Sequence, residues 1–269
     1  MSADRLVEAL GEVPDGAVVA VGGYLQQNVP MGLVAALARC GARDLTVVAA
    51  PSASLGVEYL VAAGAVGRVI CPYVGFEGRG AAPAFARAVE DGSVERPLCD
   101  QEILMTGLRA AGQSAPCGVY APTGSQVEQE SPLAREIVCP FTGGPLIAVA
   151  ALELDLALLH AQRADGSDNL VHLGSPFLDL TFAQAARRVV AEVDDRSEGR
   201  TDGAPDWTPI AGIWTDAVVA APGSAFPCAS HGSYGEDGDA VGGYLERERA
   251  APGEGARWLG ERIVAGARP

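Results

Sequence analysis

The sequence predicts an α/β fold: an open, mostly parallel, twisted sheet with helices on both faces. Apolar runs such as residues 17–21 show no polar alternation, which is typical of parallel strands buried on both faces. Amphipathic segments alternate with these runs, and that alternation favours parallel strands joined by helices. A length of 269 residues with 48% hydrophobic content suits one large domain better than two small ones. We therefore expect a single domain over residues 1–269, with a charged helical arm from about residue 237.

The first half of the chain alternates between predicted helices and strands. Residues 4–11 form a short amphipathic helix, and "GAVVAVGG" follows as a buried strand. The segment "PMGLVAALARCGA" has a proline near its start and a glycine just past its end, as helices often do. The next buried strands are "DLTVVAA" and "VGRVICPYVG", and the next helices are "SASLGVEYLVAAGA" (after a turn), "APAFARAVEDGS" and "CDQEILMTGLRAAGQ".

The second half is punctuated by longer polar segments. Residues 124–145 are polar and interrupted by proline and glycine, which predicts a surface excursion. Two apolar runs flank Glu153, and residues 195–210 are expected to form a polar linker or loop. The remaining predicted strands are "CGVYAPTG", "NLVHLG", "RVVAEV" and "TDAVVAAPGSAFP", and "PFLDLTFAQAARR" is a helix.

The composition disfavours several kinds of function. The net charge of −15 makes nucleic acid and anionic membranes unfavourable partners. All 19 basic residues are arginine, which excludes a lysine Schiff base or a phosphate-binding loop lysine. The segment "MSADRLVEAL" has neither a basic n-region nor an apolar h-region, so we expect no signal peptide, and no apolar run of membrane-spanning length is seen in the sequence. The cysteines at positions 40, 71, 99, 117, 139 and 228 form no C-x-x-C pair, so we expect buried thiols, a cytoplasmic protein and no metal site.

The glycine pair after the first strand is a candidate binding feature. Glycines at Gly22 and Gly23 would let the backbone approach a ligand, and their N–H groups could stabilise a developing negative charge. The pattern is neither G-x-G-x-x-G nor a Walker loop, so a dinucleotide site is not expected. The pair could equally be a purely structural turn.

Small polar residues stand at the predicted ends of strands, where open α/β sheets collect ligands. Ser52 and Ser54 follow the second strand, and Thr123 and Ser125 follow a later one. Their hydroxyl groups could hold a carboxylate or a thioester carbonyl, or could cap the helices that follow.

The sequence offers no self-contained catalytic set. His160 ends an apolar run, while His172 and His231 have no partner at ligand spacing. Neither G-x-S-x-G nor H-E-x-x-H occurs. Glu77 and Glu102 could be walls of a pocket.

Taken together and in order, eight motifs carry a family resemblance. They are "GGYLQQNVPMGLV", "DLTVV", "GVEYLVAAGAVGRV", "YVGFEGRGAAPAFARAVEDG", "PTG", "ALLHAQRADGSDN", "AQAARRVV" and "TDAVVAAPGSAFP". Over roughly residues 4–245 this chain resembles the alpha subunit of family I CoA-transferases of the glutaconate type. It also resembles the related subunit of the ring-cleaving hydrolase of steroid degradation.

The resemblance implies a CoA-transferase-like fold and a beta subunit of the same fold, in a heterodimer or its multiples. In such enzymes a beta-subunit glutamate attacks a small acyl-CoA, and CoA reaches another carboxylic acid through a glutamyl-CoA thioester. No cofactor is tightly bound, and coenzyme A is a substrate. Two alternatives stay open: an acyl-CoA hydrolase that cleaves a carbon–carbon bond in a cyclic diketone thioester, and a non-catalytic scaffold subunit.

The resemblance also assigns residues. The Gly-Gly-aromatic loop lies beside the substrate, the second strand ends at the pocket, and a "YVG-x-E" loop follows. A further signature at His160, Arg163, Asp165 and Asn169, with Asp168 in place of a glycine, is expected to shape that edge of the domain. The predicted substrate- or CoA-binding set is Gly22, Gly23, Tyr24, Gln26, Asn28, Ser52, Ser54, Gly75, Glu77, Thr123 and Gly124.

Two departures from the family bear on the chemistry. Many relatives carry arginine where this chain has Asn28, so the substrate is left open. The catalytic glutamate of the hydrolase type corresponds here to Gln101 or Glu102. Glu102 is therefore the candidate catalytic residue of this chain, and Gln101 in that place would disfavour hydrolysis.

Overall fold

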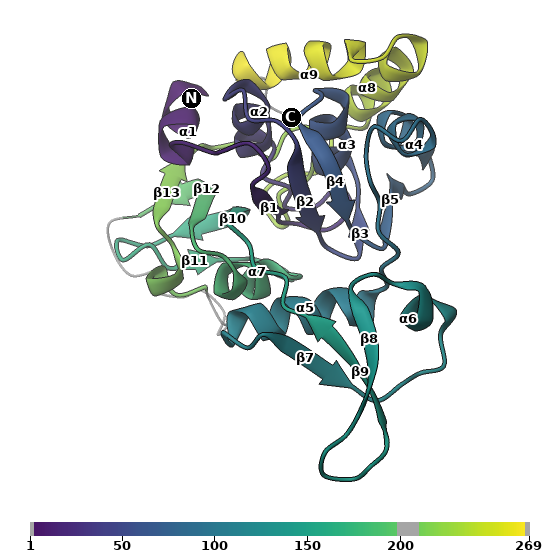
Figure 1. Ribbon diagram of the computed structural model, residues 1–269. Helices are drawn as coiled ribbons and strands as arrows, with labels where there is room; N and C mark the ends of the chain where they lie inside the picture. Colours follow the sequence, from purple (N-terminus) through teal and green to yellow (C-terminus); the bar gives the residue numbers. More distant parts are fainter. Residues whose placement is uncertain (1–2, 198–209, 267–269) are drawn as a thin grey trace.

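The central feature of the computed structural model, which describes residues 3–197 and 210–266, is a seven-stranded sheet (Figure 1). Six strands run parallel in the order β13-β12-β10-β1-β2-β4, and β11 pairs with β10 in the antiparallel direction. This arrangement confirms the predicted fold class. The strands are β1 (Val18–Val21), β2 (Leu45–Ala49), β4 (Val66–Ile70), β10 (Leu156–Ala164), β11 (Leu170–Val171), β12 (Val189–Arg196) and β13 (Ala217–Ala220).

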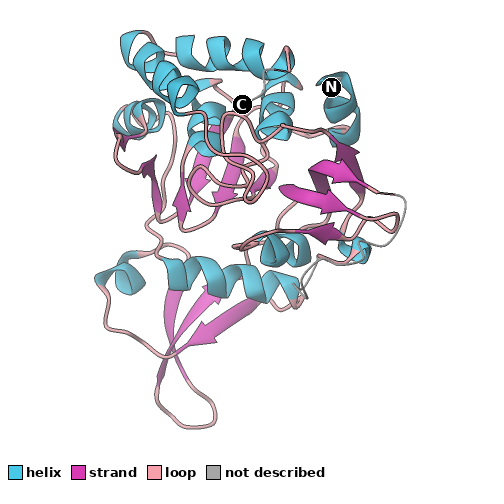
Figure 2. Cartoon of the chain, turned by 180° about the vertical axis from the view of Figure 1, so that it is seen from behind, coloured by secondary structure: helices cyan, strands magenta, loops and turns pink. Residues whose placement is uncertain are grey.

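Helices cover both faces of this sheet (Figure 2). Along β1, Val19 and Val21 pack into one apolar core, whereas Ala20 packs into the other. This is why the strand shows no polar alternation. The first core includes α1 (Ala3–Leu10), α2 (Met31–Arg39), α3 (Leu55–Ala62), α4 (Pro83–Glu90), α8 (Gly238–Ala250) and α9 (Glu254–Val264), and the second includes α5 (Gln101–Gly112) and α7 (Asp179–Ala185).

Helix α5 also carries a small antiparallel sheet of order β7-β9-β8, formed by β7 (Cys117–Tyr120), β8 (Ala134–Val138) and β9 (Pro145–Ala150). Figure 1 shows this lobe beyond the central sheet, with the β8–β9 hairpin projecting from it. Residues 124–145 are therefore more than the expected surface excursion, because they contain β8 and the short helix α6 (Gln126–Glu130). β8 is an edge strand with four of its five residues exposed, so its sequence resembles that of a loop.

The C-terminal region forms α8 and α9, which lie across the outer surface of the first core (Figure 1). Tyr244 and Leu259 are fully buried there. The guanidinium groups of Arg247 and Arg262 lie 4.3 Å and 5.0 Å from the ring centre of Trp258. These charged residues line the contact between the two helices and let the apolar stems pack.

A third small sheet adjoins the ends of the central strands. It has the order β3-β5-β6, with β3 (Ser52–Ala53) parallel to β5 (Tyr73–Phe76) and β5 antiparallel to β6 (Gly80–Ala81). It places the segment after β2 beside the segment after β4, as a site built from several strand ends requires.

Three further expectations can be compared with the described residues. Of the predicted polar linker at 195–210, positions 198–209 lie outside the described residues, and Asp195 and Arg196 belong to β12. All six cysteines are free thiols, and the expectation of burial holds for Cys71, Cys99 and Cys228. Cys40 and Cys139 are only half-buried, and Cys117 is exposed because it lies on an edge strand of the small sheet. No helix in the described ranges is both long enough and apolar enough to cross a membrane.

Candidate functional site

The Gly22–Gly23 turn follows β1 directly and needs glycine at both positions. A Cβ atom on Gly22 would lie 2.7 Å from Oδ1 of Asp179, and a Cβ atom on Gly23 would lie 2.5 Å from the backbone oxygen of Gln27. Gly23 also has a φ of +83°, in the left-handed region that side chains disfavour. The close packing therefore leaves no room for a side chain at either position.

Both N–H groups of the turn already have acceptors. Gly22 donates to the backbone oxygen of Leu158 at 2.9 Å, and Gly23 donates to Oδ1 of Asp179 at 3.1 Å. The second oxygen of Asp179 lies 3.1 Å from Nε2 of His172. The expectation that these N–H groups could stabilise a developing negative charge is not met by this conformation, in which neither is free.

The loop after the turn is conformationally strained. Leu25 and Asn28 have φ values of 50° and 54°, and Phe177, which contacts the loop, has a φ of 48°. Such left-handed conformations cost roughly 1 kcal/mol or more in residues other than glycine and cluster at functional sites. Tyr24 and Gln27 exchange backbone hydrogen bonds of 2.9 Å, which hold the loop in this shape.

The predicted residues of the first two loops contact one another. The hydroxyl group of Tyr24 donates to Oγ of Ser52 at 3.2 Å, and Nε2 of Gln26 donates to Oγ of Ser54 at 2.8 Å. The ring of Tyr24 stacks on Phe177 with the ring centres 4.9 Å apart. Sequence alone left open whether these hydroxyl groups cap helices. Ser54 occupies the N-cap position of α3 without capping it through its side chain.

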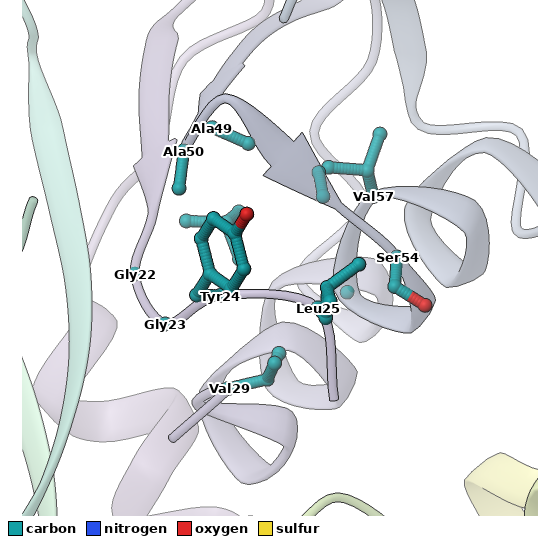
Figure 3. Close-up of a pocket in the computed structure, with 12 residues that line it drawn as sticks. Gly22, Gly23, Tyr24, Leu25, Val29, Ala49, Ala50, Ser54 and Val57 are labelled. Carbon is teal, nitrogen blue, oxygen red and sulfur yellow. The ribbon is translucent and has the colours of Figure 1, made fainter. Parts of the chain in front are cut away.

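A small cavity lies against these loops (Figure 3). Its volume is about 10 Å³, roughly what one water molecule occupies. Tyr24 and Ser54 are the lining residues with polar side chains, and the other lining residues are apolar or glycine. The lining residues are Val21, Gly22, Gly23, Tyr24, Leu25, Val29, Ala49, Ala50, Ala53, Ser54, Gly56 and Val57.

Glu77 and Gly75 lie on the neighbouring β5–β6 hairpin. Gly75 is paired with Ala81 inside that hairpin, whereas Glu77 is exposed. Glu77 and Gln26 line an open groove of about 520 Å³ that also includes Arg79, which forms an ion pair of 2.6 Å with Glu236. The groove therefore adjoins the Gly-Gly loop but has mixed charge.

Asn28 points into the protein interior. Its side chain is 1% exposed, and Oδ1 accepts hydrogen bonds from Nε2 of Gln162 at 2.9 Å and from the backbone N–H of His231 at 3.0 Å. These two donors fix the orientation of the amide. Its Nδ2 atom is buried and has no partner in the structure.

His160 is the centre of a buried polar network. Its Nε2 atom lies 3.1 Å from Oγ of Ser230 and 3.5 Å from Oδ2 of Asp194, and its Nδ1 atom lies 3.5 Å from Oε1 of Glu192. Burial by itself lowers the pKa of His160, but the hydrogen bonds and charges of Asp194 and Glu192 raise that pKa to about 9. Glu192 also accepts the backbone N–H of Leu33 at 2.8 Å, so the network holds the first turn of α2.

Two other residues of the His160 signature, Asp165 and Asn169, also accept hydrogen bonds from backbone N–H groups. Oδ1 of Asp165 accepts the backbone N–H groups of Ser167 and Asn169 at 2.9 Å and 3.1 Å. Oδ1 of Asn169 accepts the N–H of Gly212 at 2.7 Å, next to the short 3₁₀ turn η1 (Gly212–Trp214). This is the edge of the domain that the resemblance led us to expect the signature to shape.

The lobe holds a second group of predicted residues. Glu102 and Gln101 are exposed at the start of α5, where the side chain of Asp100 caps the helix by accepting from Ile103 N at 2.9 Å. Burial and the charges of Glu128, Asp100 and Glu102 raise the pKa of Tyr120. Glu102 therefore lies within electrostatic range of a phenol in an acidic environment.

Thr123 and Gly124 are held by a carboxylate of the lobe. Glu128 accepts from the N–H and the hydroxyl group of Thr123 at 3.0 Å and 2.8 Å, and from Gly124 N at 3.1 Å. Ser125 caps α6 by accepting from Val127 N at 3.2 Å. Among the described residues, no hydrogen bond joins this lobe group to the Gly22–Gly23 turn, and no group of three or more His, Cys, Asp or Glu could hold a metal ion.

Sequence reasoning missed the pair of His172 and Asp179. His172 was expected to have no partner at ligand spacing, but Nε2 of His172 contacts Asp179, and both side chains are almost fully buried. The two residues stand seven positions apart, after β11 and at the start of α7, and that spacing matches no regular pattern. The apolar context of "NLVHLG" and "PFLDL" was the signal that both side chains would be buried.

Curated relatives of this chain include both hydrolase and transferase subunits. The chain is 32% identical over 247 residues to the IpdA subunit of the cholesterol ring-cleaving hydrolase of Mycobacterium tuberculosis, covering 86% of this chain and 83% of that protein. It is 30% identical over 227 residues to the A-subunit of the 3-oxoadipate CoA-transferase of Pseudomonas putida, covering 82% of this chain and 94% of that protein.

Solved structures share the fold over almost the whole chain. A variant of the decarboxylase AibA/AibB superposes with a TM-score of 0.83 at 33% identity, covering 94% of this chain and 96% of that chain. Glutaconate coenzyme A-transferase from Acidaminococcus fermentans superposes with a TM-score of 0.85 at 23% identity, covering all of this chain and 89% of that chain. The resemblance to the glutaconate type, at this level of identity, therefore concerns the fold.

The family match follows the same boundaries. Residues 3–221 match the family described as Coenzyme A transferase, and this range contains the central strands β1 to β13, the Gly22–Gly23 turn and the His172–Asp179 pair. Together with the relatives, this match confirms the resemblance that the eight ordered motifs suggested. The chain belongs to the coenzyme A transferase family.

Proposed function

We propose that this chain is the alpha subunit of a two-subunit CoA-transferase. The pair would move CoA between an acyl-CoA and a carboxylic acid through a glutamyl-CoA thioester on the beta subunit. One observation carries the proposal: among the described residues, the carboxylate at the Gly22–Gly23 turn is that of Asp179, which is 1% exposed and hydrogen-bonded through both oxygens. Because a nucleophile must reach its substrate, that carboxylate is unsuited to attack a thioester.

A second chain would supply the missing group. The 3-oxoadipate CoA-transferase relative is named as one subunit of its enzyme, and the similarity covers 94% of that subunit's length. In the proposed reaction, a glutamate oxygen of the partner attacks the thioester carbonyl and CoA leaves as the thiolate. The thiolate then attacks the glutamyl carbonyl of the mixed anhydride and releases the first acid. The second acid takes CoA by the reverse of these steps.

In this scheme, the described chain shapes one wall of the acyl site. The Gly22–Gly23 turn packs closely against Asp179 and Gln27, and the ring of Tyr24 covers the apolar cavity beside the turn. The tight, apolar packing would keep water away from the thioester and the anhydride. Water exclusion favours transfer over hydrolysis.

A hydrolase is the second candidate. Glu102 is exposed at the start of α5, so its carboxylate is accessible as a general base. Similarity to the IpdA hydrolase chain, at 32% identity, supports this alternative, and similarity to the AibA/AibB decarboxylase shows that the scaffold serves other chemistry as well.

Trapping the intermediate distinguishes the candidates. The co-purified pair would be incubated with an acyl-CoA and then with hydroxylamine or borohydride, and both chains would be examined by mass spectrometry. A modified glutamate on the partner supports the transferase. If neither chain is modified and the pair shows hydrolysis that disappears in Glu102→Gln, the transferase proposal would give way to the hydrolase. If the experiment shows neither a modified residue nor turnover, the chain would be a non-catalytic scaffold subunit.

A further inference from the structure

The segment from His172 to Asp179 contacts the Gly22–Gly23 turn and was not among the predicted binding residues. We infer that Asp179 and His172 are positioning residues that set the turn, and through it the ring of Tyr24, for the reaction. This inference rests on the proposed function in placing the turn at the acyl-CoA site.

The first support is the geometry of the carboxylate. Oδ1 of Asp179 accepts from Gly23 N at 3.1 Å, and Oδ2 lies 3.1 Å from Nε2 of His172. The side chains of Asp179 and His172 are 1% and 3% exposed. A carboxylate is costly to bury unless its oxygens are hydrogen-bonded, and bonds to an ionised acceptor are stronger and more directional than neutral ones. The pair therefore fixes the Gly23 amide.

The second support is that the same segment contacts three consecutive residues of the loop. Oδ1 of Asp179 lies 2.7 Å from the position of a Cβ atom on Gly22 and accepts the N–H of Gly23, and Phe177 stacks on Tyr24 with an interplanar angle of 14°. Phe177 adopts its left-handed conformation at this contact. The position of the turn and the position of the ring therefore depend on one neighbouring segment.

These contacts also limit what the turn can do chemically. A substrate oxyanion at Gly23 would compete with the carboxylate of Asp179 for the same N–H and would be repelled by it. The charge that develops during transfer must then be stabilised by other donors, including those of the partner subunit. What this chain contributes at Gly23 is placement, for which an error of about 1 Å can cost about 10²-fold in rate.

The test compares Asp179→Ala with Asp179→Asn in the two-subunit complex. Asparagine can still accept from Gly23 through Oδ1, and its Nδ2 can donate to the other tautomer of His172. We expect Asp179→Ala to lower kcat by roughly tenfold or more, with KM for the acyl-CoA within about twofold. Asp179→Asn should restore most of kcat, and His172→Ala should show an intermediate loss.

Asp155→Ala is the matched control. Oδ2 of Asp155 accepts from Val18 N at 2.9 Å, so it is also a carboxylate on a backbone N–H of β1, but at the opposite end of the strand. We expect Asp155→Ala to lower the melting temperature and leave kcat per folded complex unchanged. Hydrogen exchange of a peptide spanning residues 18–29 should become faster in Asp179→Ala and stay near wild type in Asp179→Asn. Exchange is measured on the isolated chain, so it does not depend on the partner.

Two results would overturn the inference. One is a wild-type kcat in Asp179→Ala despite faster exchange, and the other is an equal loss of kcat in the Asp179 and Asp155 variants. If Asp179→Ala does not fold, His172→Ala and Asp179→Asn carry the same comparison. kcat is measured for whichever acyl-CoA reaction the wild-type complex catalyses. A complex that hydrolyses but never forms a glutamyl adduct would therefore disprove the proposed transferase and still test the positioning role.

Discussion

At the residue scale, Gly23 shows how packing and backbone conformation restrict a single position. We expect Gly23→Val to impair turnover more than folding, because a branched side chain would push the backbone of Gln27 and Asn28 out of the loop. Gly64→Val is the control, since Gly64 has a similar φ of +70° and nothing within 4 Å of the position that a Cβ atom would occupy. Both variants carry the backbone cost of roughly 1–3 kcal/mol.

The measurement is kcat of the complex together with the free energy of unfolding of the isolated chain. The difference between the two variants isolates the clash at the turn. If Gly23→Val lost activity only in proportion to its loss of folded protein, the glycine would have a purely structural role.

His160 gives a pH-dependent prediction at the same scale. Its folded-state pKa of about 9 lies above the ordinary value of 6.5, so the imidazolium stabilises the fold. That contribution is fully present below pH 6.5 and is lost as the pH rises through about 9. The groups that face the ring are the carboxylates of Glu192 and Asp194 and the hydroxyl group of Ser230.

The check is urea unfolding of the wild-type chain and His160→Gln at about pH 6, pH 7.5 and pH 9.5. We expect the wild type to be more stable by a few kcal/mol at the lowest pH. The difference in free energy of unfolding between the wild type and His160→Gln should become smaller at the highest pH. A difference that stayed constant over this pH range would show that His160 stabilises the fold through its shape and neutral hydrogen bonds.

At the scale of elements, the start of α5 separates a structural from a candidate catalytic carboxylate. Asp100 caps the helix, whereas Glu102 is exposed two positions later. We expect Asp100→Ala to lower the free energy of unfolding by about 1 kcal/mol and Glu102→Ala to change it by less than about 0.5 kcal/mol. Loss of activity in Glu102→Ala at unchanged stability would favour the hydrolase, and unchanged activity would remove Glu102 from the chemistry.

The burial of each strand and loop explains which of them could be predicted from the sequence. The strands β1, β2 and β4 were predictable because Val19 and its neighbours are apolar on both faces. The loops after β1 and β2 were predicted as one site, and Tyr24 does contact Ser52. The Asp179 contact to Gly23 could not be predicted, because it joins residues 156 positions apart through side-chain packing that no local pattern encodes. β8 was missed because an exposed edge strand lacks the apolar face that identifies strands.

At the scale of the whole molecule, the proposal makes the chain one half of an enzyme. Purified alone, it should neither transfer CoA nor form a covalent adduct with an acyl-CoA, because the nucleophile would belong to the other subunit. Mixing with the partner should restore activity at a one-to-one ratio. Full activity of the isolated chain, assayed after removal of any co-purified protein, would contradict the two-subunit argument.

The burial of Asn28 has a consequence for how this sequence can diverge. Oδ1 of Asn28 satisfies two donors, Nε2 of Gln162 and the N–H of His231. Arginine has five donors and no acceptor, so a lone Asn28→Arg exchange would leave the backbone N–H of His231 without its acceptor, whereas Nε2 of Gln162 would keep its hydrogen bond of 2.9 Å to Oγ of Ser230. A lineage that gains arginine at position 28 is therefore expected to supply the N–H of His231 with another acceptor, because exchanging a side chain does not remove a backbone donor.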